Sequence, residues 1–131
     1  TEQTGTEVKE EEFVCEMPGK KVKLAVISAD VMGKGDDELG KVLIKGFLYA
    51  LSQMETHVDT ILFYNGGAKL TTEGSDSIED LKKMEAEGTE ILTCGTCLKH
   101  YGLMEKLLVG KVTDMYTITE RMMGADKIIR P

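Results

Sequence analysis

Residues 89–102 read Thr-Glu-Ile-Leu-Thr-Cys-Gly-Thr-Cys-Leu-Lys-His-Tyr-Gly, and the fold is best worked out from this stretch. An apolar, β-prone run over residues 90–93 meets Cys94 and Gly95, and a short helical pattern follows from Thr96 to Gly102. This order predicts a cysteine at a strand-to-helix turn. In an open parallel sheet such turns lie at the carboxyl ends of the strands, where reactive groups collect.

The predicted surroundings of Cys94 favour nucleophilic sulfur chemistry. We expect its sulfur to lie in a crevice at the edge of the sheet, near the first free amides of the following helix. Those amides and the helix dipole stabilise an anion. A thiolate at Cys94 should therefore form more readily than at an ordinary exposed cysteine.

Outward from this stretch, short apolar runs alternate with segments whose apolar residues recur every three or four positions. Strands are predicted at residues 22–29, 60–64, 90–93, 112–115 and 127–130. Helices are predicted at residues 39–54, 77–88, 96–102 and 103–109 and from Thr117 onward, and a polar loop at residues 69–76. Such alternation indicates parallel βαβ units with helices on both faces. We therefore predict an α/β fold, three-layer α/β/α with a mostly parallel five-stranded sheet.

Polar residues mark the expected helix starts. Asp36 or Asp37 is placed to cap the first helix, where orphan amides need acceptors. Two capping-box-like pairs, Ser77 with Asp80 and Thr117 with Glu120, predict two later helix starts in the same way.

The length of 131 residues, with 41% hydrophobic and 30% charged residues, predicts one domain with a single core. We interpret residues 1–21 as an acidic, flexible N-terminal arm or linker and residues 22–131 as the folded domain. No apolar run approaches the roughly 18 residues that a membrane span needs, and the start of the chain lacks a signal-peptide pattern. The three cysteines do not form a disulfide framework, so we expect a cytoplasmic protein with free thiols.

Residues 1–18 of the arm hold six Glu against one Lys and account for −5 of the formal net charge of −7. The remaining body, at about −2, has no basic patch or stripe of the kind that nucleic-acid binding requires. We therefore expect neither a nucleic-acid nor a membrane partner.

A glycine-rich turn, Gly33-Lys34-Gly35, follows the first predicted strand and raises the possibility of phosphate binding. The next three residues are the carboxylates Asp36, Asp37 and Glu38, and the third glycine of a dinucleotide fingerprint is missing. These carboxylates repel a phosphate. We interpret the segment as a tight turn with a helix cap. In a second interpretation it forms part of a polar rim that faces Cys94.

The pair Cys94-Gly-Thr-Cys97 is the sharpest chemical signal, because two thiols one helical turn apart can approach each other. A thioredoxin fold is disfavoured, since the only prolines are Pro18 and Pro131. A zinc site formed by Cys94, Cys97 and His100 is a rival hypothesis. A structural zinc site needs four ligands, however, and the other candidate ligands are distant. Buried cysteines without chemistry are the remaining alternative.

Further side chains are expected near the thiols. His100 stands one turn beyond Cys97 and is a candidate to stabilise a thiolate or move a proton. Tyr64, Asn65 and Tyr101 are expected to border the same crevice. Cys15 lies in the arm with no helix after it and is interpreted as incidental.

Several blocks of sequence together resemble the YedF group of the DsrE-like (DsrE/DsrF/TusD) family over roughly residues 22–131. The blocks are residues 32–40 (Met-Gly-Lys-Gly-Asp-Asp-Glu-Leu-Gly), 63–67 (Phe-Tyr-Asn-Gly-Gly), 73–76 (Glu-Gly-Ser-Asp), 93–102 (Thr-Cys-Gly-Thr-Cys-Leu-Lys-His-Tyr-Gly) and 125–131 (Ala-Asp-Lys-Ile-Ile-Arg-Pro). The resemblance implies a sulfurtransferase-like protein linked to selenium metabolism. The wider family includes sulfur-relay subunits that carry a persulfide on one cysteine, and its members often assemble into oligomers.

Carried over by position, the persulfide-bearing cysteine of the family matches Cys94, eight residues before Gly102, and Cys97 matches the second cysteine typical of the YedF group. YedF proteins usually begin with a TusA-like domain bearing a Cys-Pro-x-Pro motif, and residues 15–18 (Cys-Glu-Met-Pro) are not that motif. We therefore expect a carboxy-terminal domain without the TusA-like domain.

The leading functional hypothesis is a sulfur or selenium carrier that accepts a persulfide on Cys94 and hands it to another thiol. Cys97 would resolve the persulfide by forming a disulfide. No cofactor or metal is implied. Expected partners are sulfur-donor and sulfur-acceptor proteins, including a TusA-like domain or protein, and further copies of the chain. The alternatives are a dithiol redox or regulatory module and a non-catalytic oligomeric binding subunit.

Overall fold

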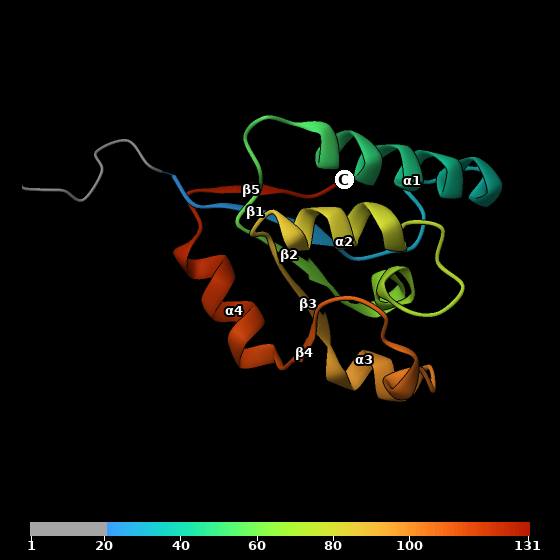
Figure 1. The fold of residues 1–131 in the computed structure, drawn as a ribbon. Helices are drawn as coiled ribbons and strands as arrows, with labels where there is room; N and C mark the ends of the chain where they lie inside the picture. The colour runs from blue at the N-terminus through green and yellow to red at the C-terminus, as the bar shows by residue number, and fades with distance from the viewer. Residues whose placement is uncertain (1–20) are drawn as a thin grey trace, which may run out of the picture.

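A computed structural model describes residues 21–131, which form one sheet flanked by helices (Figure 1). The strands are β1 (Lys23–Ile27), β2 (Thr60–Phe63), β3 (Glu90–Cys94), β4 (Lys111–Thr113) and β5 (Lys127–Ile129). They are parallel throughout and lie in the order β4-β3-β2-β1-β5. The predicted five-stranded parallel sheet is therefore confirmed. The predicted arm lies outside the described residues except for Lys21, and Cys15 lies outside them as well.

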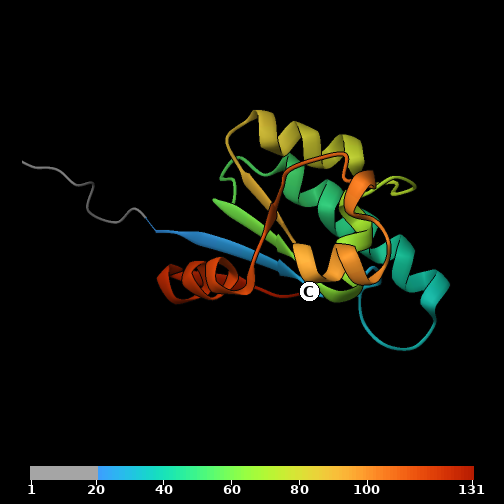
Figure 2. The same ribbon diagram turned by 90° about the horizontal axis from the view of Figure 1, so that it is seen from below.

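Helices cover both faces of this sheet and complete the three layers that the sequence predicts. They are α1 (Asp37–Gln53), α2 (Ile78–Ala86), α3 (Gly95–His100) and α4 (Met115–Gly124), with the 3₁₀ segments η2 (Asn65–Thr71) and η3 (Met104–Lys106). The two views place α1 and α2 on one side of the sheet and α4 on the other (Figures 1 and 2). No helix among residues 21–131 has the length and apolar character to cross a bilayer.

The strand period of two divides the core into two clusters. Ala25 and Ile27 of β1 pack with α1 and α2, whereas Leu24 and Val26 pack with α4. The first cluster also contains Ile44, Leu48, Leu51, Val58, Ile61, Phe63, Leu70, Ile78, Leu81, Met84, Ile91 and Val109. Because both faces are covered, the strands are buried on both sides, as their continuous apolar runs predict.

Helix caps agree with the sequence at one predicted site and differ at two. Asp36 caps α1, since its Oδ1 accepts a hydrogen bond from the Leu39 amide at 3.0 Å. The start of α4 is capped by Asp114 through the Thr117 amide at 2.9 Å, so the predicted Thr117–Glu120 box is wrong by one turn. Ser77 immediately precedes α2, so this predicted helix start is confirmed, although the Ser77 side chain makes no capping hydrogen bond.

Two predicted segments differ from the structure, and in the second of them pairing between distant residues replaces local helix formation. The predicted loop at 69–76 begins inside η2, and of the predicted helix at 103–109 only η3 is helical. Leu107 instead forms an antiparallel bridge with Thr72, and the Leu108 amide donates to the Thr71 carbonyl at 2.9 Å. These bonds hold residues 107–108 extended, and β4 begins at Lys111, one residue before the predicted strand.

An ion pair ties α4 to the start of β3. Arg121 donates to both carboxylate oxygens of Glu90, at 2.9 and 3.0 Å, and Thr60 donates to the same carboxylate at 3.0 Å. The Arg121 hydrogen bond holds the pKa of Glu90 below its usual value. The pair fixes α4 over the strand that carries Cys94.

Candidate functional site

The first thiol lies where the sequence predicts, at a strand-to-helix turn. Cys94 is the last residue of β3, and α3 begins at Gly95. Glycine is needed there because a Cβ on Gly95 would come within 2.9 Å of Val112 Cγ1. The close approach to β4, where Cys94 pairs with Thr113, allows α3 to start directly at the carboxyl edge of the sheet.

Cys94 is more deeply buried than the sequence predicts. Its side chain is 3% exposed and belongs to the apolar cluster on the α4 face. That cluster also contains Leu24, Val26, Leu62, Leu92 and Ile118, with Tyr64, Cys97, Met122 and Ala125 packed against it. The expected open crevice around Cys94 is therefore wrong. The reason is the strand period, which points Cys94 to the same side as Leu92, toward α4.

Cys97 is the more accessible thiol. It lies one helical turn after Cys94, is partly buried, and packs against the same cluster. Its Sγ accepts a hydrogen bond from the Asn65 amide at 3.0 Å. Burial raises the pKa of the Cys97 thiol, and the neighbouring Cys94 raises it further, while the Asn65 amide acts in the opposite direction.

The residues predicted to border the thiols do so through a short hydrogen-bonded chain. Asn65 has φ of +49°, a left-handed conformation that Asn tolerates better than most residues. The Tyr101 hydroxyl donates to Asn65 Oδ1 at 2.9 Å, and Lys69 Nζ lies 4.8 Å from the centroid of the Tyr101 ring. The bond to Tyr101 links α3 to η2 and holds the Asn65 amide against Cys97.

Arg130 is a site residue that the sequence does not indicate. Its Nη1 donates to the Tyr64 hydroxyl at 3.5 Å. Arg130 reaches the site because β5 pairs with β1 in parallel, which brings the end of the chain to the same edge of the sheet as the end of β2. No local pattern signals this contact, since the two residues are 66 positions apart.

The structure brings Cys94 and Cys97 together but leaves His100 to one side. His100 is exposed, and its ring lies edge-on to Tyr101 with 5.2 Å between centroids. In the described part of the chain no hydrogen bond joins His100 to either sulfur. Its predicted role in proton transfer stays a prediction.

Comparison with known protein families supplies the decisive observation. Residues 40–131 match the DsrE/DsrF-like family. This region begins inside α1, runs through β5 and contains Cys94 and Cys97. The chain belongs to the DsrE/DsrF-like family. Comparison with curated protein sequences gave no significant match.

Solved structures similar to this DsrE/DsrF-like domain support the fold. The ychN protein from E. coli has a TM-score of 0.64 at 15% identity, with 86% of this chain and 100% of that chain covered. MTH1491 from Methanobacterium thermoautotrophicum, a protein of unknown function, has 0.63 at 19% identity, with 86% and 100% covered. BT1422 from Bacteroides thetaiotaomicron, a conserved protein of unknown function, has 0.58 at 16% identity, with 83% and 94% covered. At these identities the likeness concerns the fold alone.

The other sequence candidates have structural explanations in this DsrE/DsrF-like domain. The Gly33–Gly35 segment forms an exposed turn with positive φ at both glycines, and it leads into the Asp36 cap of α1. This confirms the turn-and-cap interpretation. Within residues 21–131, no three His, Cys, Asp or Glu side chains are grouped to hold a metal ion.

The different exposure of the two thiols predicts an order of labelling. In the folded protein, iodoacetamide should modify Cys97 at least about tenfold faster than Cys94, because only Cys97 is accessible. Since the pKa of Cys97 is raised, its labelling rate should increase with pH through a midpoint above that of an ordinary cysteine. Peptide mass spectrometry after timed quenching measures both rates.

Denatured protein is the control for this labelling experiment. In denaturant the two cysteines should react at similar rates with an ordinary midpoint, because the fold no longer shields either. Faster labelling of Cys94 than of Cys97 in the folded protein would contradict the arrangement described above.

Proposed function

We propose that this DsrE/DsrF-like domain is a sulfur carrier of the YedF group that holds a persulfide on Cys94. The observation that carries the proposal is the position of Cys94 directly before α3, with a second free thiol one turn later. The family match supports it, because sulfur relay is common in this family. Cys94 is the N-cap residue of α3, but its side chain makes no capping hydrogen bond with the helix amides.

The proposed transfer is redox-neutral. The Cys94 thiolate attacks the outer sulfur of a donor persulfide, R–S–SH. The donor S–S bond breaks, its electron pair leaves with the donor thiolate, and Cys94–S–SH forms with the proton retained on the outer sulfur. An acceptor thiolate then attacks that outer sulfur and releases the Cys94 thiolate. No oxidant or reductant is consumed in either step.

In this proposal, partner thiols reach the buried Cys94 sulfur from the side on which Cys97 lies. An S–S bond of about 2 Å projects the outer sulfur of a persulfide beyond Sγ, and the neighbouring Cys97 is the accessible member of the pair. Cys97 also resolves the persulfide: its thiolate attacks Cys94 Sγ, a Cys94–Cys97 disulfide forms, and hydrosulfide leaves. A thiol reductant then restores both thiols with two electrons.

The proposed partners follow from this chemistry. A sulfur-donor protein and an acceptor, such as a TusA-like domain or protein, bring their own thiols to the carboxyl edge of the sheet. Selenium in place of sulfur uses the same attack and leaving group. Exposed apolar side chains on α4, namely Met115, Tyr116 and Met123, support assembly into homo-oligomers.

A dithiol redox or regulatory module is the second candidate function. It is favoured by the contact between two free thiols, which only need to lose two hydrogens to form a disulfide. A non-catalytic oligomeric binding subunit would use neither thiol.

Sulfur loading of the wild-type protein separates these functions. The protein is incubated with a low-molecular-weight persulfide under exclusion of oxygen, trapped with an alkylating agent, and mapped by mass spectrometry. We expect one added sulfur on Cys94, located by fragmentation of the peptide that contains both Cys94 and Cys97. Loss of two hydrogens without added sulfur would support the redox module, and an unchanged mass would support the binding subunit.

A further inference from the structure

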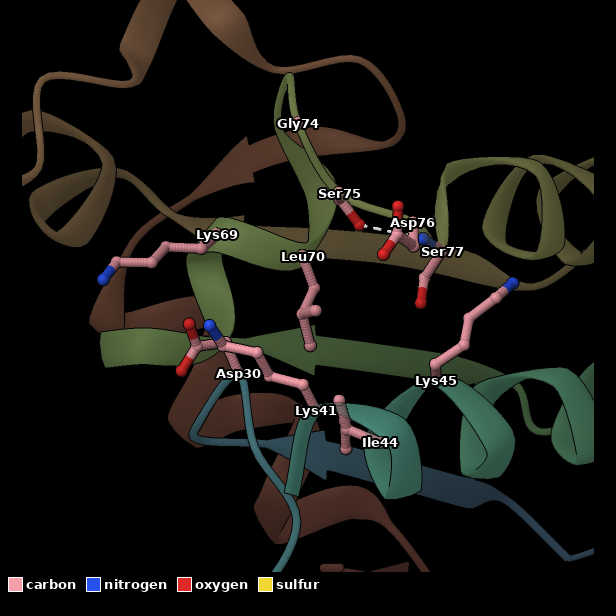
Figure 3. A pocket seen from close by; sticks show the side chains of 10 residues that line it. All are labelled: Asp30, Lys41, Ile44, Lys45, Lys69, Leu70, Gly74, Ser75, Asp76 and Ser77. Atoms are coloured by element: carbon pink, nitrogen blue, oxygen red, sulfur yellow. Dashed lines mark hydrogen bonds between the residues drawn. The ribbon is translucent and has the colours of Figure 1, made fainter. Parts of the chain in front are cut away.

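A cavity of about 310 Å³ opens between α1, η2 and the start of α2 (Figure 3). Its lining includes Lys41, Ile44 and Lys45 of α1 and Leu70 of η2. It lies on the α1–α2 face of the sheet, whereas the Cys94 side chain lies on the α4 face. Its size is at the lower end of the range that small-molecule sites occupy. The cavity is therefore a site separate from the thiols.

Ser77 lines this cavity with a buried hydroxyl group that lacks a partner. Its side chain is 1% exposed and points into the space between Leu70 and Lys45 (Figure 3). The Ser77 amide donates to Ser75 Oγ at 3.0 Å, but the Ser77 hydroxyl makes no hydrogen bond with any residue of 21–131. A buried hydroxyl without a partner is unfavourable, and native proteins rarely leave one in that state. The hydroxyl is therefore available to a ligand.

The start of α2 adds positive potential at the same wall. Ser77 immediately precedes this nine-residue helix. With its φ of −103° and ψ of 5°, its hydroxyl makes no hydrogen bond with the helix amides. The first amides of α2 thus have no side-chain cap from Ser77. Free amides at a helix start bind anions, and phosphate is the group most often held there.

The charged side chains around the cavity define the ligand more closely. Lys41, Lys45 and Lys69 outnumber Asp30 and Asp76 among the lining residues. Lys45 is engaged by Asp80 at 2.7 Å, which lies in the first turn of α2, and Lys69 points its ammonium group away from the cavity (Figure 3). Lys41 makes only an exposed ion pair with Glu38, at 4.0 Å, and so supplies the most available positive charge. The two carboxylates repel a bare anion and suit a ligand that also carries an amino or hydroxyl group.

We propose that this cavity binds a small phosphomonoester with an amino or hydroxyl group on its body. The phosphate accepts from the Ser77 hydroxyl and lies near the start of α2 and Lys41. The body contacts Ile44 and Leu70, and its amino or hydroxyl group faces Asp30 or Asp76. The cavity exceeds the size of a phosphate ion, which favours an ester over free phosphate.

Phosphoethanolamine is a suitable probe, with inorganic phosphate and ethanolamine as its two halves. Binding is measured by NMR titration of the full chain and by the ligand-dependent rise in Tm. We expect phosphoethanolamine to bind at least several-fold more tightly than either half. Equal binding of inorganic phosphate would reassign the site to the free ion and overturn the ester proposal. No shift with any probe up to about 10 mM would overturn the site itself.

Two variants test the assigned residues. Ser77→Ala should weaken phosphoethanolamine binding about tenfold or more, because a hydrogen bond to a charged group is lost. Lys41→Gln should weaken it several-fold and make it less sensitive to salt. Lys82→Gln is the matched control, since Lys82 is exposed on α2 and does not line the cavity. Binding by Ser77→Ala and Lys41→Gln equal to that of Lys82→Gln would overturn the proposal.

Stability of the unliganded variants gives an independent readout. Ser77→Ala should leave Tm unchanged or raise it, because an unpaired buried hydroxyl is removed. Ser52→Ala is the contrasting variant, since Ser52 is equally buried but donates to the Tyr49 carbonyl at 2.6 Å, and its Tm should fall. A fall for Ser77→Ala as large as that for Ser52→Ala would show that the Ser77 hydroxyl already has a partner, and would overturn the proposal.

Discussion

Replacing Cys94 with serine is expected to abolish persulfide loading. A serine hydroxyl is a weak nucleophile without an adjacent base, so the rate of sulfur gain should fall by at least about a hundredfold. Cys97→Ser should still gain sulfur on Cys94, because Cys97 resolves the persulfide in the proposal and does not carry the stored sulfur. Mass spectrometry of the trapped peptides measures the gain in each variant.

The burial of Cys94 requires a second control for that experiment. A serine hydroxyl in the apolar cluster on the α4 face has no obvious partner, and such a group costs about 1–3 kcal/mol. Cys94→Ala introduces no polar group and should stay folded with the same loss of loading. Sulfur gain on Cys97 at the wild-type rate in either folded variant would refute the assignment of Cys94 as the carrier.

Replacing Gly67 with alanine is expected to cause a large loss of stability. Gly67 lies in η2, and a Cβ there would overlap the Ile27 carbonyl oxygen and come within 2.9 Å of its carbonyl carbon. Backbone atoms of a central strand cannot yield as a flexible side chain can. We expect a loss of roughly 3 kcal/mol, or a fall in Tm of about 10 °C.

The preceding glycine provides the matched control. A Cβ on Gly66 would meet Ala29 and Asp30 at no less than 3.5 Å, which is ordinary van der Waals contact. Gly66→Ala should therefore change Tm by only a few degrees. Thermal unfolding followed by circular dichroism measures both variants. Equal Tm values would mean that η2 is not held against β1 as closely as described.

Much of the fold was predictable because its signals are local. The apolar runs predicted all five strands. The spacing of apolar residues by three and four positions predicted α1, and the Ser77–Asp80 pair predicted the start of α2. Errors occurred where contacts between distant residues decide the local conformation. Residues 107–108 have a sequence compatible with a helix, but hydrogen bonds to residues 71 and 72 hold them extended.

The site was predictable to the same extent. The glycine after Cys94 and the spacing to Cys97 placed both thiols at the start of α3. The Asn65 amide that faces Cys97 sits 32 positions away, and the contact of Arg130 with Tyr64 spans 66. Such contacts depend on strand order, which no single segment encodes. The cavity beside Ser77 likewise arises from several separate segments.

The amino-acid sequence by itself determined the order of strands and helices and the position of two thiols one turn apart at a strand end. Only the tertiary structure decided which thiol is accessible. Cys94 is buried because its side chain points to the face of the sheet that α4 covers. Cys97 is partly exposed because it lies on a short helix at the edge of the sheet. Local pattern specifies backbone conformation, whereas exposure depends on which distant elements pack over each face of the sheet.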